Sequence, residues 1–191
     1  RLAWRAGSGR LRTTRSDGKW HVRYWTRTRL SVAEVRQRAM RYFGTEAVPD
    51  MALVLREPGR LLFSDPSGDL AVRVDAGQPN TVSVITSHWH AQAQEFLKRQ
   101  VEAEGGVIHY EAVSERPPGE ILQHAREYFG QGAQGLGLAV SAEQPQSVEF
   151  SGGGGQVTVA VRSNGQASIH VSAREWDYHA EQFVRQVTSE H

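Results

Sequence analysis

The chain of 191 residues contains no cysteine, and this absence removes several kinds of chemistry at once. Without cysteine there is no disulfide framework, no thiolate ligand for a metal and no thiol nucleophile. Long apolar runs are also missing, since a stretch such as MALVL at 51–55 is far too short to cross a bilayer. The N-terminus has no long apolar segment of the secretory kind. We therefore expect a cytoplasmic protein that does not engage membranes.

The net charge of +1 hides a strong asymmetry along the chain. Residues 1–41 hold 12 Lys and Arg against 2 acidic residues, a net charge of +10, whereas the other 150 residues hold 10 and 19, a net charge of −9. A basic arm followed by an acidic body is typical of proteins with an anionic partner. The alternative is that the arm, residues 1–18, is merely soluble or docks on the acidic body of its own chain.

An internal duplication organises the sequence after this arm. VAEVRQRAMRYFG at 32–44 aligns with PGEILQHAREYFG at 118–130, with six identities in 13 positions and an offset of 86. Farther along, the offset becomes 87, as in Phe63 with Phe150 and Phe96 with Phe183. The repeat predicts a first copy over 19–104 and a second over 105–191.

Both copies show the same order of elements, read from alternating apolar residues, helical spacing and turn residues. Each begins with a strand and a helix that ends at a glycine, Gly44 or Gly130, which predicts left-handed helix ends there. Ser31 and Glu34 form a capping-box pattern at the start of the first such helix. The predicted elements are strand 19–29, helix 32–44, strands 51–56, 60–64, 69–74 and 81–87 and helix 91–105, and then strand 107–114, helix 118–130, strands 135–141, 146–151, 156–162 and 167–174 and helix 178–190.

The order β-α-β-β-β-β-α, present twice, resembles the duplicated saddle of the TATA-binding protein family. The resemblance implies an α+β fold in which two tandem repeats, related by a pseudo-twofold axis, form one curved antiparallel sheet with the helices on its convex face. A lipid-binding fold of the steroidogenic-transfer type, with one long helix against a curved sheet, is the second possibility. The TATA-binding family inserts apolar wedges into DNA, but Phe63 and Phe150 are in phase with core positions, so this sequence does not repeat that feature.

Three clusters resemble sites of chemistry. SGGGG at 151–155 joins two predicted strands and has no following lysine, which favours a hairpin turn over a phosphate loop. His88 and His90 form an H-x-H pattern that suits zinc if it lies on a strand, but the second copy has Glu175 and Asp177 at these places. A metal-assisted or acid–base hydrolase using either pair, or the Glu175–His179 region, is the enzymatic alternative. No cofactor motif is present, and we predict neither a catalytic set nor a metal site.

The strand residues that alternate with the apolar ones are polar and mostly basic, and they should line the concave face of the sheet. From this face we select the candidate ligand-binding residues Arg23, Trp25, Arg27, Arg73, Arg162, His170 and Arg174. The leading hypothesis is a non-enzymatic binding module whose basic sheet face and arm engage nucleic acid, another protein or a small anion. A simple solvated sheet face and a structural subunit that pairs with another chain are the remaining alternatives.

Overall fold

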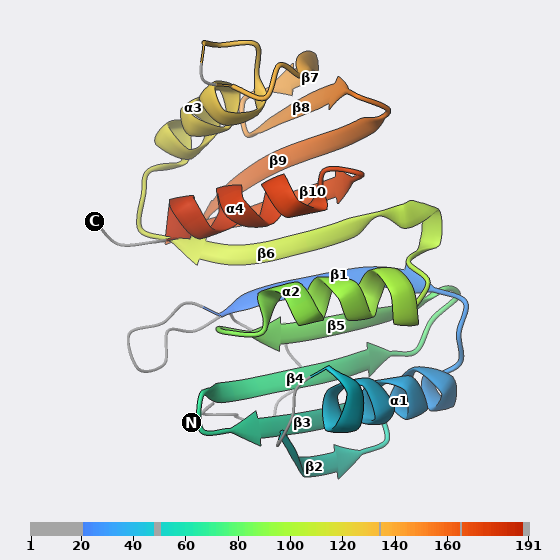
Figure 1. The fold of residues 1–191 in the computed structure, drawn as a ribbon. Helices are drawn as coiled ribbons and strands as arrows, with labels where there is room; N and C mark the ends of the chain where they lie inside the picture. Colours follow the sequence, from blue (N-terminus) through green and yellow to red (C-terminus); the bar gives the residue numbers. More distant parts are fainter. Residues whose placement is uncertain (1–20, 48–50, 134, 165, 189–191) are drawn as a thin grey trace. The chain divides into compact units, whose positions relative to one another are not determined.

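The computed structural model describes residues 21–47, 51–133, 135–164 and 166–188, and it divides into two units at Ile108 and His109 (Figure 1). The predicted arm 1–18 and the first residues of the predicted opening strand lie outside the described residues. None of the helices in the described part of the chain combines the length and the apolar character that crossing a membrane requires.

The first unit contains a five-stranded antiparallel sheet in the order β2-β3-β4-β5-β1, with helices on one of its faces. Its elements are β1 (Val22–Thr28), α1 (Val32–Arg41), η1 (Tyr42–Glu46), β2 (Ala52–Glu57), β3 (Arg60–Asp65), β4 (Gly68–Asp75), β5 (Asn80–Thr86), α2 (His90–Glu95), η2 (Phe96–Gln100) and η3 (Glu104–Gly106).

The second unit repeats this arrangement with the strand order β6-β10-β9-β8-β7. Its elements are β6 (Ile108–Ser114), α3 (Pro118–Phe129), β7 (Ala139–Gln144), β8 (Ser147–Gly152), β9 (Gly155–Asn164), β10 (Gln166–Arg174) and α4 (Asp177–Thr188). The prediction of an α+β fold with β-α-β-β-β-β-α in each copy and helices on one sheet face is confirmed.

Three phenylalanines form the centre of each core. In the first unit, the ring of Phe43 lies 5.6 Å from that of Phe63 and 4.9 Å from that of Phe96, measured between centroids. In the second, the corresponding trio of Phe129, Phe150 and Phe183 is joined by separations of 5.5 Å and 5.2 Å. All six side chains are fully buried. Because each trio takes one ring from a strand and two from helices, it fixes both helices to the same sheet face.

The helix starts follow the sequence, but the helix ends do not. The Ser31 hydroxyl accepts from the backbone N–H of Glu34, and the Glu34 carboxylate accepts from the N–H of Ser31, so the capping box is present. The left-handed ends expected at Gly44 and Gly130 are wrong. Gly44 lies inside the π-helical segment η1, and Gly130 is extended. Gly130 is required for space instead, since a Cβ there would lie 2.3 Å from the carbonyl oxygen of Arg126.

A π-helical segment explains how the offset between the copies returns from 87 to 86 within the closing helix. In η2 the N–H of Val101 donates to the carbonyl of Phe96, five residues earlier, at 2.9 Å. This wider turn holds one residue more than an α-turn, so Phe96 pairs with Phe183 at offset 87 whereas Val101 corresponds to Val187 at 86. The predicted continuation of this helix to residue 105 is wrong, because Glu102 has a positive φ of 57° that breaks the helix.

The glycine run forms the β8–β9 hairpin, as predicted. Gly153 and Gly154 make the two-residue loop with φ of 58° and 81°, which is the conformation that a type I′ turn requires. Gly155 lies against the indole of Trp176, where a Cβ would approach the ring Cδ1 to 2.6 Å. The Trp176 Nε1 donates to the carbonyl of Gly152 at 3.0 Å. The run therefore provides the site on which Trp176 packs.

Candidate functional site

The face of each sheet opposite its helices, here called the open face, carries the residues selected from the sequence. Along β1, side chains alternate between buried residues on the helix side, such as Tyr24, and half-buried or exposed residues on the open face. Arg23, Trp25 and Arg27 are the three residues of β1 on the open face, with Trp25 between two arginines. Successive members of this trio lie about 7 Å apart along the strand.

The backbone register brings a fourth candidate into line with Trp25. Trp25 pairs with Ser83 of β5, and Ser83 pairs with Arg73 of β4, so these three lie in one row across the sheet. Arg60 of β3 extends the row, since it pairs with Arg73. Arg60 was not selected from the sequence, because its place beside Arg73 depends on strand register, which alternation alone does not give.

Arg23 is held in place by a buried hydroxyl. Its Nη2 donates to the Ser83 Oγ at 2.8 Å and its Nε donates to the same oxygen at 3.2 Å. Ser83 is fully buried. These two bonds orient the guanidinium on the open face. The guanidinium carbon lies 6.0 Å from the centroid of the Trp25 ring, at the outer limit of a cation–π contact.

The other two arginines of the first unit differ in how their charge is balanced. Arg27 is exposed near the end of β1. Arg73 forms an ion pair with Asp75 on its own strand, with its Nε and Nη2 each 2.7 Å from the carboxylate Oδ1. Asp75 therefore offsets part of the charge that Arg73 adds to the open face.

In the second unit, the open face carries Arg162, His170 and Arg174. Arg162 pairs with Ser168 in the β9–β10 register, and Arg174 lies six residues farther along β10, about 20 Å away. Both arginines are exposed. The structure therefore places them on the predicted face but does not bring them together.

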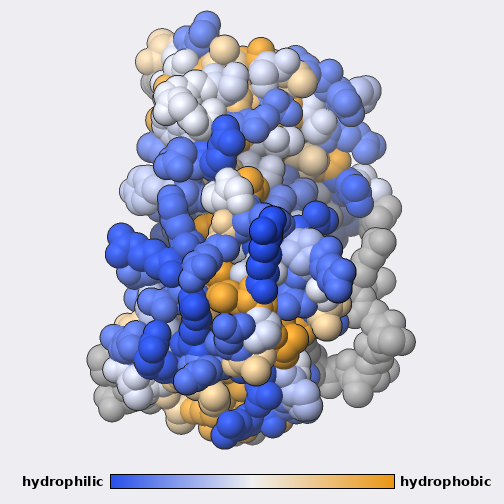
Figure 2. Space-filling view, turned by 90° about the vertical axis from the view of Figure 1, so that its right-hand side faces the viewer, coloured by the Kyte–Doolittle hydropathy of each residue, from blue (hydrophilic) through white to orange (hydrophobic). Residues whose placement is uncertain are grey.

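Hydrophilic residues dominate the side of the molecule seen in Figure 2, with smaller hydrophobic areas between them.

His170 lies between these two arginines along the strand and stacks on a residue that the sequence did not suggest. The rings of His109 and His170 lie 5.3 Å apart and are almost parallel, at 11°. His109 belongs to β6, and the spatial neighbour of β6 in this unit is β10. Only the strand order reveals this pair, so no spacing in the sequence could have indicated it.

The H-x-H pattern does not lie on a strand, contrary to the geometry that a zinc site on the sheet would need. β5 ends at Thr86, whose hydroxyl accepts from the N–H groups of His88 and Trp89 at 3.2 Å and 3.1 Å. The Nδ1 of His90 is hydrogen-bonded to the hydroxyl of Tyr24 at 2.8 Å. In the second unit the hydroxyl of Tyr110 donates to the carbonyl of Asp177 instead. His90 and Asp177 correspond in the two copies, and each bonds the tyrosine of the first strand, His90 through its ring and Asp177 through its backbone carbonyl.

The Glu175–His179 region surrounds the start of α4. Glu175 is exposed with a positive φ of 66°, and Asp177 is the buried first residue of the helix. The ring of His179 lies 5.5 Å from that of Trp176, and its Nδ1 is 3.5 Å from the Tyr128 hydroxyl. Burial raises the pKa of Tyr128 above its ordinary value, and the nearby Tyr178 adds to this shift. Both effects favour the protonated hydroxyl of Tyr128 in this aromatic cluster.

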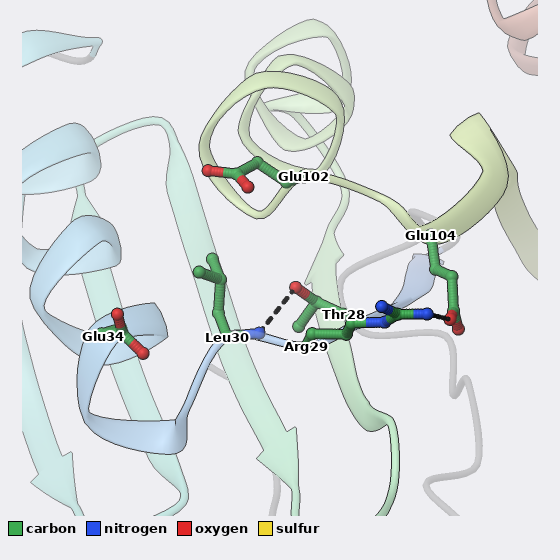
Figure 3. A pocket seen from close by; sticks show the side chains of 6 residues that line it. All are labelled: Thr28, Arg29, Leu30, Glu34, Glu102 and Glu104. Carbon is green, nitrogen blue, oxygen red and sulfur yellow. Dashed lines mark hydrogen bonds and ion pairs between the residues drawn. The ribbon is translucent and has the colours of Figure 1, made fainter.

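Among the residues that the structure describes, no three His, Asp or Glu side chains gather so that they could hold a metal ion. A pocket of about 310 Å³ does lie at the end of β1 in the first unit, lined by Thr28, Arg29, Leu30, Glu34, Glu102 and Glu104 (Figure 3).

The carboxylates of this pocket already have protein partners. Arg29 points toward Glu104, with 3.6 Å between their charged atoms, and Glu102 lies 2.8 Å from the guanidinium of Arg38. The Ser31 hydroxyl, followed by the Ser31 backbone N–H, holds the pKa of Glu34 below its ordinary value. These contacts account for the acidic groups as parts of a helix cap and of surface ion pairs.

Comparison with known proteins gives no family for this chain. No model of a known protein family matches, and no curated protein is similar to it. Among solved structures, it is similar to DynU16 of the dynemicin biosynthetic locus, at 12% identity over 88% of this chain and 94% of that one, with a TM-score of 0.33. It is also similar to the di-domain ARO/CYC protein BexL from the BE-7585A biosynthetic pathway, at 8% identity over 87% and 93%, with a TM-score of 0.23.

Proposed function

We propose that this protein is a non-enzymatic binding module that holds a polyanion on the open face of its first unit. The observation that supports the proposal is the arrangement on β1, where Arg23 and Arg27 lie on either side of Trp25. The Arg23 guanidinium is oriented by two bonds to the buried Ser83 hydroxyl. A fixed cation loses little side-chain entropy when it meets an anion, so its contribution to binding is larger than that of a freely rotating side chain.

Charge along the chain favours the same class of partner. The net charge of +10 over residues 1–41 includes both of these arginines and the whole of the arm. In the sequence the arm 1–18 comes shortly before β1, and we propose that it adds positive charge to the same polyanion contact. Fixed cations beside a basic segment give binding that is strong at low ionic strength and falls steeply with salt.

A heparin column tests the proposal, because heparin is a polyanion that any such surface should retain. We expect the intact chain to bind at low salt and to elute only as the salt concentration rises. Arg27→Gln should elute at lower salt. The matched control is Arg56→Gln, since Arg56 is also an exposed strand arginine of the first unit but pairs with the core residue Leu61 on the helix side.

Repeating the comparison in a protein that lacks residues 1–18 separates the contribution of the arm to heparin binding from that of the sheet. The truncated protein should elute earlier than the intact chain, while Arg27→Gln still elutes before Arg56→Gln within it. The proposal fails if the intact chain is not retained, or if the two arginine variants elute together in both backgrounds.

A further inference from the structure

Two strands of the first unit are buried on both of their faces. In β5, the five residues from Val82 to Thr86 are all buried, although their side chains alternate between the helix side and the open face. In β4, Leu70, Ala71 and Val72 are buried in succession as well. The helices of this unit lie on one face of the sheet (Figure 1), so they account for only part of this burial. A strand buried on both faces is covered on both sides.

The second unit shows ordinary one-sided burial at the same places. β10 is the counterpart of β5, and its buried residues alternate with half-buried or exposed ones along the whole strand. Ser172 corresponds to Ile85 at offset 87 and is half-buried, whereas Ile85 is only 5% exposed. The same sheet therefore leaves this position partly accessible in one copy and covers it in the other.

The covered residues belong to an apolar row that crosses the open face of the first unit. Ile85 pairs with Ala71 of β4, which pairs with Leu62 of β3. Leu55 of β2 ends the row opposite Leu62. The first two residues are buried and the last two are half-buried, so the cover is tightest next to β1. The corresponding residues of the second copy are Ser172, Thr158, Glu149 and Ala142.

Neighbouring side chains on the open face do not explain the burial of Ile85. Ala71, its partner on β4, and Ser83, two residues before it on β5, are both small. Arg23, its partner on β1, directs its guanidinium to the Ser83 hydroxyl. The apolar surface over Ile85 must therefore come from another part of the chain or from another molecule.

The arm, residues 1–18, is the part of the chain best placed to supply this surface. It ends three residues before His21, where the described residues begin, and Arg23 then pairs with Ile85. A segment of this length spans up to about 60 Å when extended, whereas the row from β5 to β3 is about 10 Å wide. Its sequence sets apolar residues among arginines, as in RLAWR at 1–5 and RLR at 10–12.

We infer that the arm docks on the open face of the first unit, with its apolar side chains on the row that begins at Ile85. The inference goes beyond the proposed function, because the docking needs no ligand. The cover leaves the other end of β1 accessible, since Arg27 is exposed and its partner Thr81 is half-buried. The arginines of a docked arm lie on the same face as Arg27 and add to its positive charge.

Limited trypsin digestion of the intact chain, with no polyanion present, tests the docking. The arm offers cleavage sites at Arg5, Arg10, Arg12 and Arg15, and a docked arm is cut only through its undocked fraction. Ile85→Ser, which introduces the residue of the second copy, should speed cleavage within the arm by roughly 10-fold, as expected when the burial of one isoleucine is lost. Ile85→Val should stay close to the wild type, because valine remains apolar.

Two further variants make the digestion specific. Leu62→Glu also copies the second unit and should speed cleavage of the arm in the same direction. Val140→Ser removes an apolar strand residue that is 48% exposed in the second unit, and it should leave cleavage of the arm unchanged. Cleavage after Arg56, which lies in β2, reports any general loosening of the first unit.

Three results would overturn the inference. The first is an arm that is cut equally fast in the wild type, Ile85→Ser and Leu62→Glu. The second is faster cleavage in these variants that affects the arm and Arg56 alike, since the substitutions would then have loosened the sheet. The third is protection of the arm that depends on protein concentration and accompanies a dimer in light scattering, because a second copy would then cover the row. Heparin retention enters none of these results, so the proposed function stands or fails separately.

Discussion

The hydroxyl of Thr28 donates a 2.6 Å hydrogen bond to the backbone carbonyl of Val101, joining the last residue of β1 to the end of η2. The second copy makes the same connection with a different side chain, from the hydroxyl of Ser114 to the carbonyl of Val187. Each repeat thus ties its first strand to its closing helix through one buried hydroxyl. Thr28 and Ser114 are 86 residues apart and make equivalent hydrogen bonds, as expected for a duplicated sequence.

Replacing Thr28 by valine should lower the free energy of unfolding by about 1–3 kcal/mol. Valine keeps the shape of the side chain but removes the bond to Val101, and it also removes the acceptor for the N–H of Leu30, which lies 3.2 Å from the Thr28 oxygen. Thr28 is buried, so water does not readily replace these partners. Urea unfolding measures the change.

Thr45→Val provides the comparison, because the Thr45 hydroxyl also donates to a backbone carbonyl, that of Arg41, but is exposed to water. We expect its effect to stay within about 0.5 kcal/mol. Equal losses of unfolding free energy in Thr28→Val and Thr45→Val would show that the buried hydrogen bonds of Thr28 stabilise the first unit no more than the exposed bond of Thr45.

The sequence predicted the order of the elements because the duplication presented each pattern twice, but the strand predicted at 135–141 lies at Ala139–Gln144. The strand pattern at 107–114 and the helix pattern at 118–130 match those at 19–29 and 32–44, so the same elements are predicted in both copies. The π-helical segments were missed. The second unit makes the equivalent contact, Phe129 with Phe183, from ordinary α-helices, so neither this contact nor the local helical spacing indicates the π-helical segments.

Gly155→Ala should cost about 1–3 kcal/mol of folding free energy. The added methyl carbon would lie 2.5 Å from the carbonyl oxygen of Arg174 and 2.6 Å from the Cδ1 of Trp176, so either the β9–β10 pair or the indole must move. Chemical unfolding and the tryptophan emission spectrum report the two effects separately.

Gly119→Ala is the matched substitution for this prediction. Gly119 lies in the first turn of α3, and a Cβ there meets no atom within 4 Å. Alanine at this position should leave stability unchanged or raise it by up to about 1 kcal/mol. If Gly155→Ala proved as harmless as Gly119→Ala, the glycine run would not be needed to accommodate Trp176.

The capping box should give the first unit a measurable dependence on acid. The bond from the Ser31 hydroxyl, and then that from the Ser31 N–H, holds the pKa of Glu34 below its ordinary value of 4.5. A lowered folded-state pKa stabilises the protein above the ordinary value, and this contribution disappears as the pH falls through the lowered pKa. The wild type should therefore exceed Glu34→Gln in stability at pH 7, and the difference should vanish in strong acid.

A double-variant cycle identifies the cause of that difference. In a Ser31→Ala background, the pH-dependent gap between Glu34 and its glutamine variant should shrink, because the main hydrogen bond to the carboxylate is gone. An unchanged gap would assign the effect to the Ser31 backbone N–H, which Ser31→Ala retains, or to the charge of Arg38.

The candidate site was only partly accessible from sequence. Alternation placed Arg23, Trp25 and Arg27 on one strand face, and the strand register adds that Arg73 lies in the same row as Trp25. Alternation could not show that Ser83 orients Arg23 or that Asp75 pairs with Arg73. Those contacts depend on side-chain conformations and on neighbours 60 residues away in the case of Ser83.

The slope of binding affinity against salt concentration tests the central claim most directly. For an oligonucleotide, the logarithm of the binding constant should fall linearly and steeply with the logarithm of salt. Arg27→Gln should make the slope shallower by about 1, as expected for one lost phosphate contact, whereas Arg56→Gln should leave it unchanged. A slope that is identical in the wild type and Arg27→Gln, or that changes equally in both variants, would contradict polyanion binding on the open face of the first unit.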